Sequence, residues 1–211
     1  MKMLVCLETI LRFRQQVISM NASHQILETK TLSDKRARLS EIRFELQYSD
    51  GAAFTPTKEV YDIGDASSVL LYDSERKTVV FTRQFRLPAA LSGVPQGLLL
   101  EACAGKTEGK PAEDTARREA MEEIGYALGS LEKVATVFSS PAAIQEVIHL
   151  FIAPYTPSMK TAEGGGLAGE NEHVEDVEMR FDDAMAMMET GEIRHAKTII
   201  LLQHLRLKGL M

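Results

Sequence analysis

Polar and apolar residues alternate along residues 24–64, which is the pattern of strands with one buried and one solvated face. The alternation is clearest in HQILETKTL and in RLSEIRFELQYSDG. Ser49, Asp50 and Gly51 interrupt it with residue types that favour turns. The sequence therefore predicts a small antiparallel sheet over residues 24–64.

Continuous apolar runs replace the alternation further along the chain, and they predict buried strands. The segments SSVLLYD and TVVFTRQFRL are separated by SERK, which predicts a hairpin with a short loop. We expect further strands at GLLLEACAG, EKVATVFSS, EVIHLFIAPY and VEDVEMRF, and helices at DDAMAMMETGE and AKTIILLQHLRL. This mixed order indicates an α+β fold or an α/β/α sandwich.

A further helix is predicted between Pro111 and Gly125. Proline is favoured in the first turn of a helix and glycine just after its end. Glu113 and Asp114 would lie near the positive end of the helix dipole. Apolar residues recur at every fourth position and form a buried stripe of Ala116, Ala120 and Ile124.

Three glutamates crowd onto this predicted helix in the stretch RREAMEEIGY. Glu119 and Glu123 share one face at the edge of the core, about 100° round from the buried stripe. One interpretation is a solvated surface on which neighbouring arginines pair with the glutamates. The other is a cation site, because like charges at this spacing repel each other. Several carboxylates without a nearby histidine or cysteine favour Mg²⁺, with Mn²⁺ as the alternative.

Composition limits the classes of function. The chain has 211 residues, of which 45% are hydrophobic, and a net charge of −6. It has enough apolar residues for a core. The absence of a basic run argues against binding to nucleic acid or to an anionic membrane. Cys6 and Cys103 are the only cysteines and lie far apart in the sequence, which favours a reducing compartment, the cytoplasm, over a disulfide scaffold.

Residues 1–23 lie outside these patterns, and we expect them to form a leader, either a short amphipathic helix or a flexible segment. Charged residues interrupt their apolar run too early for a signal peptide, and no stretch reaches the length of a membrane span. Met20 is an alternative start. The expected organisation is a leader over residues 1–23, a sheet over residues 24–64 and the main domain over residues 65–211.

The segment GKTEGKPAEDTARREAMEEIGY resembles the Nudix box, a loop–helix–loop signature, with matches at Gly105, Arg118, Glu119, Glu122, Glu123 and Gly125. The loop before Arg118 is one residue shorter than usual, and Lys110 or Pro111 stands where the box has its first glutamate. Residues 24–207 resemble the GDP-mannose pyrophosphatase branch of the Nudix hydrolases more than the ADP-ribose branch. The resemblance implies a Nudix fold, with a mixed sheet in an α/β/α sandwich and an N-terminal antiparallel dimerisation sheet.

The resemblance also implies a metal site at the diphosphate of the substrate. The implied ligands are the carbonyl of Ala104, the carboxylates of Glu119 and Glu123, and Glu172 of the acidic loop GGGLAGENE. Glu170 is the competing residue in that loop. Glu122 is implied as a catalytic residue that faces the ligands or holds Arg118, and Arg118 as a brace of the loop.

Glu146 is implied to contact the substrate and to act as general base. A carboxylate near a cation stays ionised and can take a proton from water. Ala142 and Ala143 stand where the family commonly has glycines, so the loop that carries Glu146 departs from the family pattern.

The substrate-binding set implied by the resemblance is Arg36, Lys58, Glu59, Arg86, Ala104, Gly105, Lys106, Glu146 and Lys197. A guanidinium such as that of Arg86 matches phosphate oxygens with two hydrogen bonds. Taken without the resemblance, the sequence would indicate that Arg86 is a surface arginine at a strand end. It would likewise indicate that Lys197 is a solvated lysine at a helix start. Arg36 stands where relatives commonly carry an aromatic residue that stacks on the base in the partner's site, and arginine can stack as well.

The implied activity is divalent-metal-dependent hydrolysis of GDP-mannose to GMP and mannose 1-phosphate by a homodimer. The first alternative is an ADP-ribose or broad nucleotide-sugar pyrophosphatase, which the changed Arg36 and the alanines at 142–143 allow. The second is a catalytically silent, nucleotide-sensing Nudix module. The intact glutamates of the box and the absence of a basic DNA-binding helix argue against that module.

Overall fold

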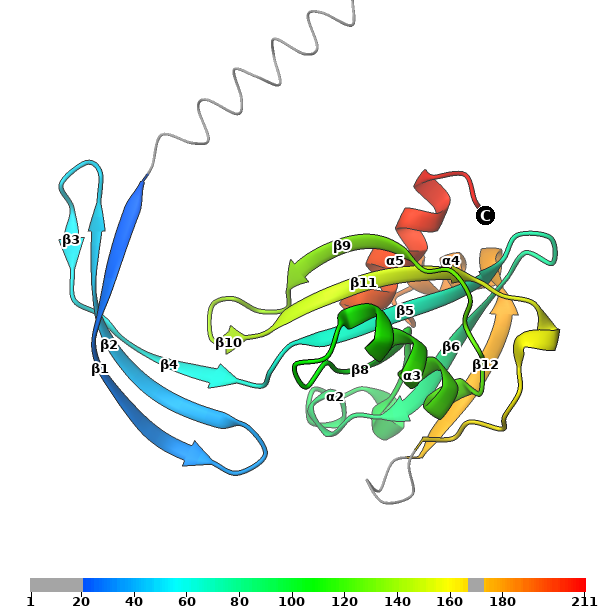
Figure 1. Ribbon diagram of the computed structural model, residues 1–211, viewed down its shortest axis with the longest axis horizontal. Helices are drawn as coiled ribbons and strands as arrows, with labels where there is room; N and C mark the ends of the chain where they lie inside the picture. Colours follow the sequence, from blue (N-terminus) through cyan, green and yellow to red (C-terminus); the bar gives the residue numbers. More distant parts are fainter. Residues whose placement is uncertain (1–20, 167–172) are drawn as a thin grey trace, which may run out of the picture. The chain divides into compact units, whose positions relative to one another are not determined.

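A computed structural model gives the fold and describes residues 21–166 and 173–211 (Figure 1). The described chain divides into two compact units. The first holds the described residues up to Ile63 together with Ala142–Gln145, and the second holds Gly64–Pro141 and Glu146–Met211. The segment Ala142–Gln145 therefore belongs to the first unit, although it lies between two parts of the second in the sequence.

The first unit is a single sheet in the order β1-β2-β4-β10, with β3 paired to β2. Its strands are β1 (Ala22–Asp34), β2 (Arg38–Tyr48), β3 (Ala53–Phe54), β4 (Thr57–Asp62) and β10 (Ile144–Gln145). The pairs β1–β2, β2–β3 and β2–β4 are antiparallel, as the sequence predicts, and only β10 runs parallel to its neighbour β4. β1 begins at Ala22, before the expected start of the sheet, and β10 is too short to produce a recognisable pattern.

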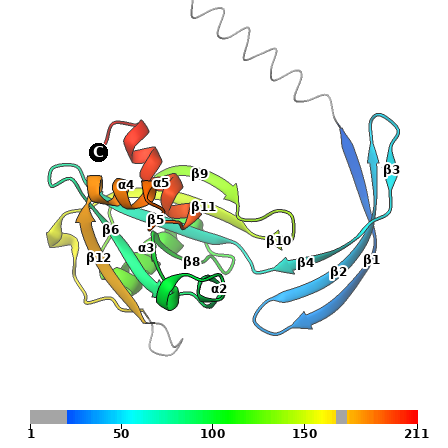
Figure 2. The ribbon, with the colours of Figure 1, turned by 180° about the vertical axis from the view of Figure 1, so that it is seen from behind.

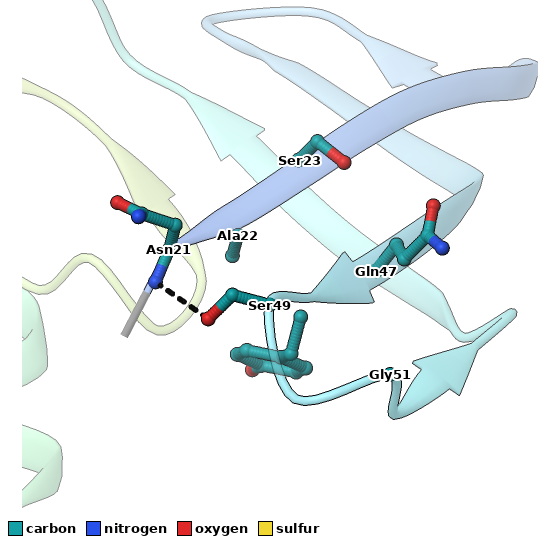
Figure 3. A pocket seen from close by; sticks show the side chains of 7 residues that line it. Asn21, Ala22, Ser23, Gln47, Ser49 and Gly51 are labelled. Carbon is teal, nitrogen blue, oxygen red and sulfur yellow. Dashed lines mark hydrogen bonds between the residues drawn. The ribbon is translucent and has the colours of Figure 1, made fainter. Parts of the chain in front are cut away.

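An open hollow of about 440 Å³ lies at the end of β1 and β2, lined by Asn21, Gln47 and Ser49 among others (Figure 3). The backbone N–H of Asn21 donates to Oγ of Ser49 at 3.3 Å. The lining residues are all uncharged, and none belongs to the predicted substrate-binding set. This hollow is therefore not the expected diphosphate site.

The second unit is built on a mixed sheet in the order β12-β6-β5-β11-β9, with β7 paired to β6 and β8 paired to β5. Among the described strands of this sheet, β5 and β11 are the only parallel neighbours. The strands are β5 (Ala66–Asp73), β6 (Thr78–Phe85), β7 (Leu98–Glu101), β8 (Cys103–Lys106), β9 (Glu132–Phe138), β11 (Val147–Pro154) and β12 (Val174–Arg180). The predicted β5–β6 hairpin is confirmed.

Helices cover both faces of this sheet, as the two opposite views show (Figures 1 and 2). They are α2 (Leu87–Leu91), α3 (Ala112–Ile124), α4 (Phe181–Glu189) and α5 (Ala196–Leu207), with short 3₁₀ turns at Pro95–Gly97 and Pro157–Met159. One core packs α3 on Val69, Leu71 and Phe151. The other packs α4 and α5 on the opposite face, around Leu70 and Phe81. None of the described helices is long and apolar enough to cross a membrane.

One predicted strand, residues 97–105, was wrong as a single element. The chain breaks at Ala102 into β7, which pairs with β6, and β8, which pairs with β5. At the break the N–H of Ala102 donates to Oγ1 of Thr198 at 2.7 Å. A continuous apolar run does not reveal where a strand changes partners, because that depends on neighbours far away in the sequence.

Candidate functional site

Helix α3 supplies the acidic side of the site. Pro111 is its N-cap, and Gly125 ends it in the left-handed conformation at φ 76°, which glycine adopts without strain. Ala116, Ala120 and Ile124 are 1% exposed or less. These small and apolar residues hold α3 tightly against the sheet, so its next face also lies close to a strand.

That next face carries Glu119 and Glu123, which are 9% and 4% exposed. Oε2 of Glu123 accepts the backbone N–H of Ala104 at 3.2 Å. A Cβ on Gly105 would lie only 1.8 Å from Oε1 of Glu119. The two carboxylates therefore lie directly against β8, and only glycine at position 105 leaves room for them.

Arg118 links the glutamates of the helix. Its Nη2 donates to Oε1 of Glu119 at 2.6 Å, and its Nη1 donates to Oε2 of Glu122 at 2.7 Å. Nη2 also lies 3.4 Å from the carbonyl oxygen of Lys106. Arg118 thus braces the loop, and Glu122 holds Arg118, which was one of its two expected roles.

The negative charge of this face also affects the pKa of the neighbouring Cys103. Burial raises the pKa of its thiol well above the usual value, and the charge of Glu123 adds to the effect, followed by those of Glu119 and Glu122. Buried carboxylates with hard oxygen donors beside a backbone carbonyl fit a divalent cation such as Mg²⁺. The described part of the chain holds no cluster of three His, Cys, Asp or Glu side chains that would bind a metal alone.

The predicted further ligands, Glu172 and Glu170, lie outside the described residues. The segment just before them is tied to the last turn of α3. The N–H of Gly165 donates to the carbonyl of Glu123 at 2.9 Å, and that of Gly166 donates to the carbonyl of Glu122 at 3.1 Å. The described start of the acidic loop therefore lies against the end of the helix that carries Glu119 and Glu123.

Basic residues gather in the same unit. Arg86 donates from Nε and Nη2 to the two carboxylate oxygens of Glu101, both at 2.9 Å. Lys197 is the second residue of α5, and its burial lowers the pKa of its ammonium group. The carboxylates of Glu101, Glu146 and, more weakly, Glu123 act in the opposite direction. Lys197 therefore lies within the electric field of both the box and the Glu146 loop.

Asp65 anchors the loop that carries Glu146. Its Oδ1 accepts the backbone N–H of Val147 at 3.0 Å. Its carbonyl oxygen accepts the N–H of Thr107 at 2.9 Å, in the loop of the box. Asp65 thus joins the residue after Glu146 to the segment that precedes α3, and the sequence offered no pattern that identified it.

The predicted residues of the first unit form no shared site within that unit. Arg36 is exposed in the bend between β1 and β2. Lys58 and Glu59 are both exposed on β4. Neighbouring residues of a strand point to opposite faces, so within one chain they cannot both face the same ligand.

Comparison with known proteins identifies the domain. The NUDIX domain profile matches residues 63–202. The chain belongs to the NUDIX domain family. The predicted Nudix domain is therefore confirmed, and the segment that resembles the box, α3 with its preceding loop, lies within the matched residues.

This Nudix chain is similar to curated bacterial proteins over most of its length. It is 42% identical over 192 residues to the GDP-mannose pyrophosphatase of Cronobacter sakazakii, which covers 91% of this chain and 100% of that protein. It is also 42% identical over 190 residues to the GDP-mannose pyrophosphatase of Pectobacterium atrosepticum, with 90% and 97% covered. These relatives extend the likeness beyond the Nudix box to both units.

A solved structure supports the fold. The crystal structure of an ADP compounds hydrolase matches with a TM-score of 0.65 and covers 89% of this chain and 95% of that chain. The two sequences are only 17% identical, so the likeness concerns the fold alone. Nudix pyrophosphatases generally need divalent metal ions, which agrees with the oxygen donors of α3 and β8.

Proposed function

We propose that this Nudix chain hydrolyses the pyrophosphate bond of a nucleoside diphosphate sugar, with GDP-mannose as substrate and GMP and mannose 1-phosphate as products. The observation that carries this proposal is the identity of about 40% to proteins named GDP-mannose pyrophosphatase over nine-tenths of the chain. The intact box carboxylates, buried against β8, support an active hydrolase over a silent module.

In the proposed site, the acidic side holds Mg²⁺ and the basic side binds the substrate. Glu119, Glu123 and the carbonyl of Ala104 would hold the ion together with Glu172. Bound divalent ions neutralise the diphosphate and lower the pKa of water. Arg86 and Lys197 would bind phosphate oxygens, and backbone at Gly105 and Lys106 would line the same face. The site would thus stabilise the negative charge that develops on the diphosphate mainly through the fixed positions of these groups.

Glu146 is our proposed general base. It is half-buried, and its charge opposes the lowering of the pKa of Lys197, which supports a place for both residues in the same site. Val147, next to it, is tied to Asp65, so the loop is held at one end. A fixed carboxylate beside the diphosphate can accept a proton from the attacking water.

We further propose a cytoplasmic homodimer. Large apolar side chains are exposed on the sheet of the first unit, among them Ile26, Leu27 and Phe54 at 51%, 42% and 57%. Exposed apolar patches of this kind mark association surfaces. In a dimer, Arg36 and one of Lys58 and Glu59, which point to opposite faces of β4, would complete the partner's site. Light scattering is expected to give twice the chain mass of 23.4 kDa, and a single-chain mass would contradict the dimer.

A substrate panel tests the activity. With Mg²⁺, we expect GDP-mannose to be hydrolysed with a kcat/KM at least about tenfold above that of ADP-ribose, a discrimination within reach of one recognition pocket. Chelation with EDTA is expected to abolish turnover, and added Mg²⁺ or Mn²⁺ to restore it. Chromatography of GMP and mannose 1-phosphate gives the rates and the cleaved bond.

The same panel distinguishes the alternatives. A preference for ADP-ribose, or equal turnover of many nucleotide sugars, would replace GDP-mannose by the broader pyrophosphatase. Binding of a nucleotide sugar without turnover under any divalent ion would favour the sensing module.

A further inference from the structure

Glu101 is the least exposed carboxylate among the described residues, at 3%. It ends β7 and lies outside the Nudix box. Both of its oxygens accept hydrogen bonds from the guanidinium of Arg86, whose side chain is 39% exposed. The buried carboxylate of Glu101 thus binds the partly exposed side chain of Arg86. Two parallel hydrogen bonds fix the plane of the guanidinium.

The backbone around Glu101 is held from two sides. Oγ1 of Thr82 lies 3.3 Å from the carbonyl oxygen of Glu101 and donates to it. The N–H of the next residue, Ala102, donates to Oγ1 of Thr198. The backbone that carries the Glu101 side chain is therefore fixed. Its carboxylate is a rigid partner for the longer side chain of Arg86.

Glu101 also lies close to a histidine, His195, and its carboxylate interacts electrostatically with Lys197. Nε2 of His195 lies 3.9 Å from Oε2 of Glu101, while Nδ1 of His195 lies 3.0 Å from Oγ1 of Thr198. Burial lowers the pKa of His195 to about 4, so this ring is neutral at pH 7. Burial alone would raise the pKa of Glu101, but the hydrogen bond from Arg86 and the positive charges of Arg86 and Lys197 lower it below its usual value. Glu101 therefore stays ionised beside Arg86 and Lys197.

We propose that Glu101 is the positioning residue of the phosphate-binding side, holding Arg86 by one edge and offsetting the mutual repulsion of Arg86 and Lys197. This inference rests on the proposed function, in which those two cations bind the diphosphate. Glu101 itself is too buried to contact the substrate. It acts by setting where the guanidinium points and by keeping Lys197 protonated in a partly desolvated place.

The competing explanation is that the pair only stabilises the fold. The chain offers a matched control, because Arg76 makes a similar two-bond pair with Glu178 at 2.9 and 2.5 Å. Glu178 also accepts a hydrogen bond from Tyr155, and this network is separate from that of Glu101. Glu178→Gln removes a comparable ion pair without touching Arg86 or Lys197.

The kinetic test compares Glu101→Gln, Glu101→Asp and Glu178→Gln with the wild type on GDP-mannose and Mg²⁺. We expect Glu101→Gln to raise KM about tenfold with a smaller change in kcat, because the misplaced cations bind the substrate less well. Glu101→Asp retains the charge and is expected to recover part of the loss. Glu178→Gln is expected to keep both constants. An unchanged KM in Glu101→Gln, or in Glu101→Asp if the glutamine variant does not fold, overturns the inference.

A second readout does not depend on turnover. Only a neutral amine reacts with an acylating reagent, so the pH dependence of Lys197 acylation, read by peptide mass spectrometry, reports its protonation. Removal of the carboxylate in Glu101→Gln is expected to move the midpoint to lower pH, while Glu101→Asp and Glu178→Gln keep it. An unmoved midpoint contradicts the role of Glu101. If the wild type hydrolyses no nucleotide sugar, the proposed function fails, and the acylation result still tests the charge relation separately.

Discussion

Glu123→Gln is expected to slow hydrolysis at least about 100-fold, the loss seen when one strong transition-state contact is removed, while the protein still folds. Glu123 is 4% exposed and accepts the N–H of Ala104. Glutamine has nearly the same shape and retains an oxygen that can accept this hydrogen bond. The substitution therefore removes mainly a negative charge from the face assigned to the divalent ion.

Rates on GDP-mannose with Mg²⁺, together with thermal unfolding, measure this effect. Without metal, the variant is expected to unfold at the same temperature as the wild type or at a higher one, because one of three crowded carboxylates is neutralised. Glu113→Gln is the matched control, since Glu113 lies on the same helix with its side chain 58% exposed. A rate close to that of the wild type for Glu123→Gln would refute the metal assignment.

Gly105→Ala is expected to reduce the rate about 100-fold and to weaken the binding of Mn²⁺, with little loss of stability. The new Cβ would lie 1.8 Å from Oε1 and 2.0 Å from Cδ of Glu119. The end of a glutamate side chain can rotate away, so the fold survives. The displaced group, however, is a proposed metal ligand, and a displacement of about 1 Å at such a site is enough for a loss of this size.

Calorimetric Mn²⁺ titration and steady-state kinetics of Gly105→Ala measure both effects. Gly129→Ala is the control, because a Cβ at Gly129 meets nothing within 4 Å and the backbone there needs no left-handed conformation. Wild-type metal affinity in Gly105→Ala would show that Glu119 is not held where the proposed site requires it.

The sequence was most informative where the chemistry is local. The bounds of α3 follow from Pro111, Gly125 and the four-residue repeat of Ala116, Ala120 and Ile124. The helical spacing of Glu119 and Glu123 likewise places both carboxylates on one face. These features depend on neighbours within a few turns of the chain, so a single sequence contains them.

The sequence was least informative where a group takes its role from distant partners. Glu101 lies in a plain apolar run, and nothing near it in the sequence indicates the hydrogen bonds from Arg86, 15 residues away. Asp65 and Thr198 were missed for the same reason, since their partners are 82 and 96 residues away. Arg86 was predicted as a phosphate ligand, but its paired carboxylate came only from the fold.

The sequence by itself determined the Nudix box, the order of strands and helices around it, and the acidic face of α3. Only the tertiary structure shows that β8 approaches this face closely enough to require Gly105. It also shows that residues 97–105 divide between two partner strands, and that Glu101 pairs with Arg86. The physical reason is the distance along the sequence over which each interaction acts. Helix periodicity and capping act over a few residues, whereas strand pairing and buried ion pairs join segments that only the folded chain brings together.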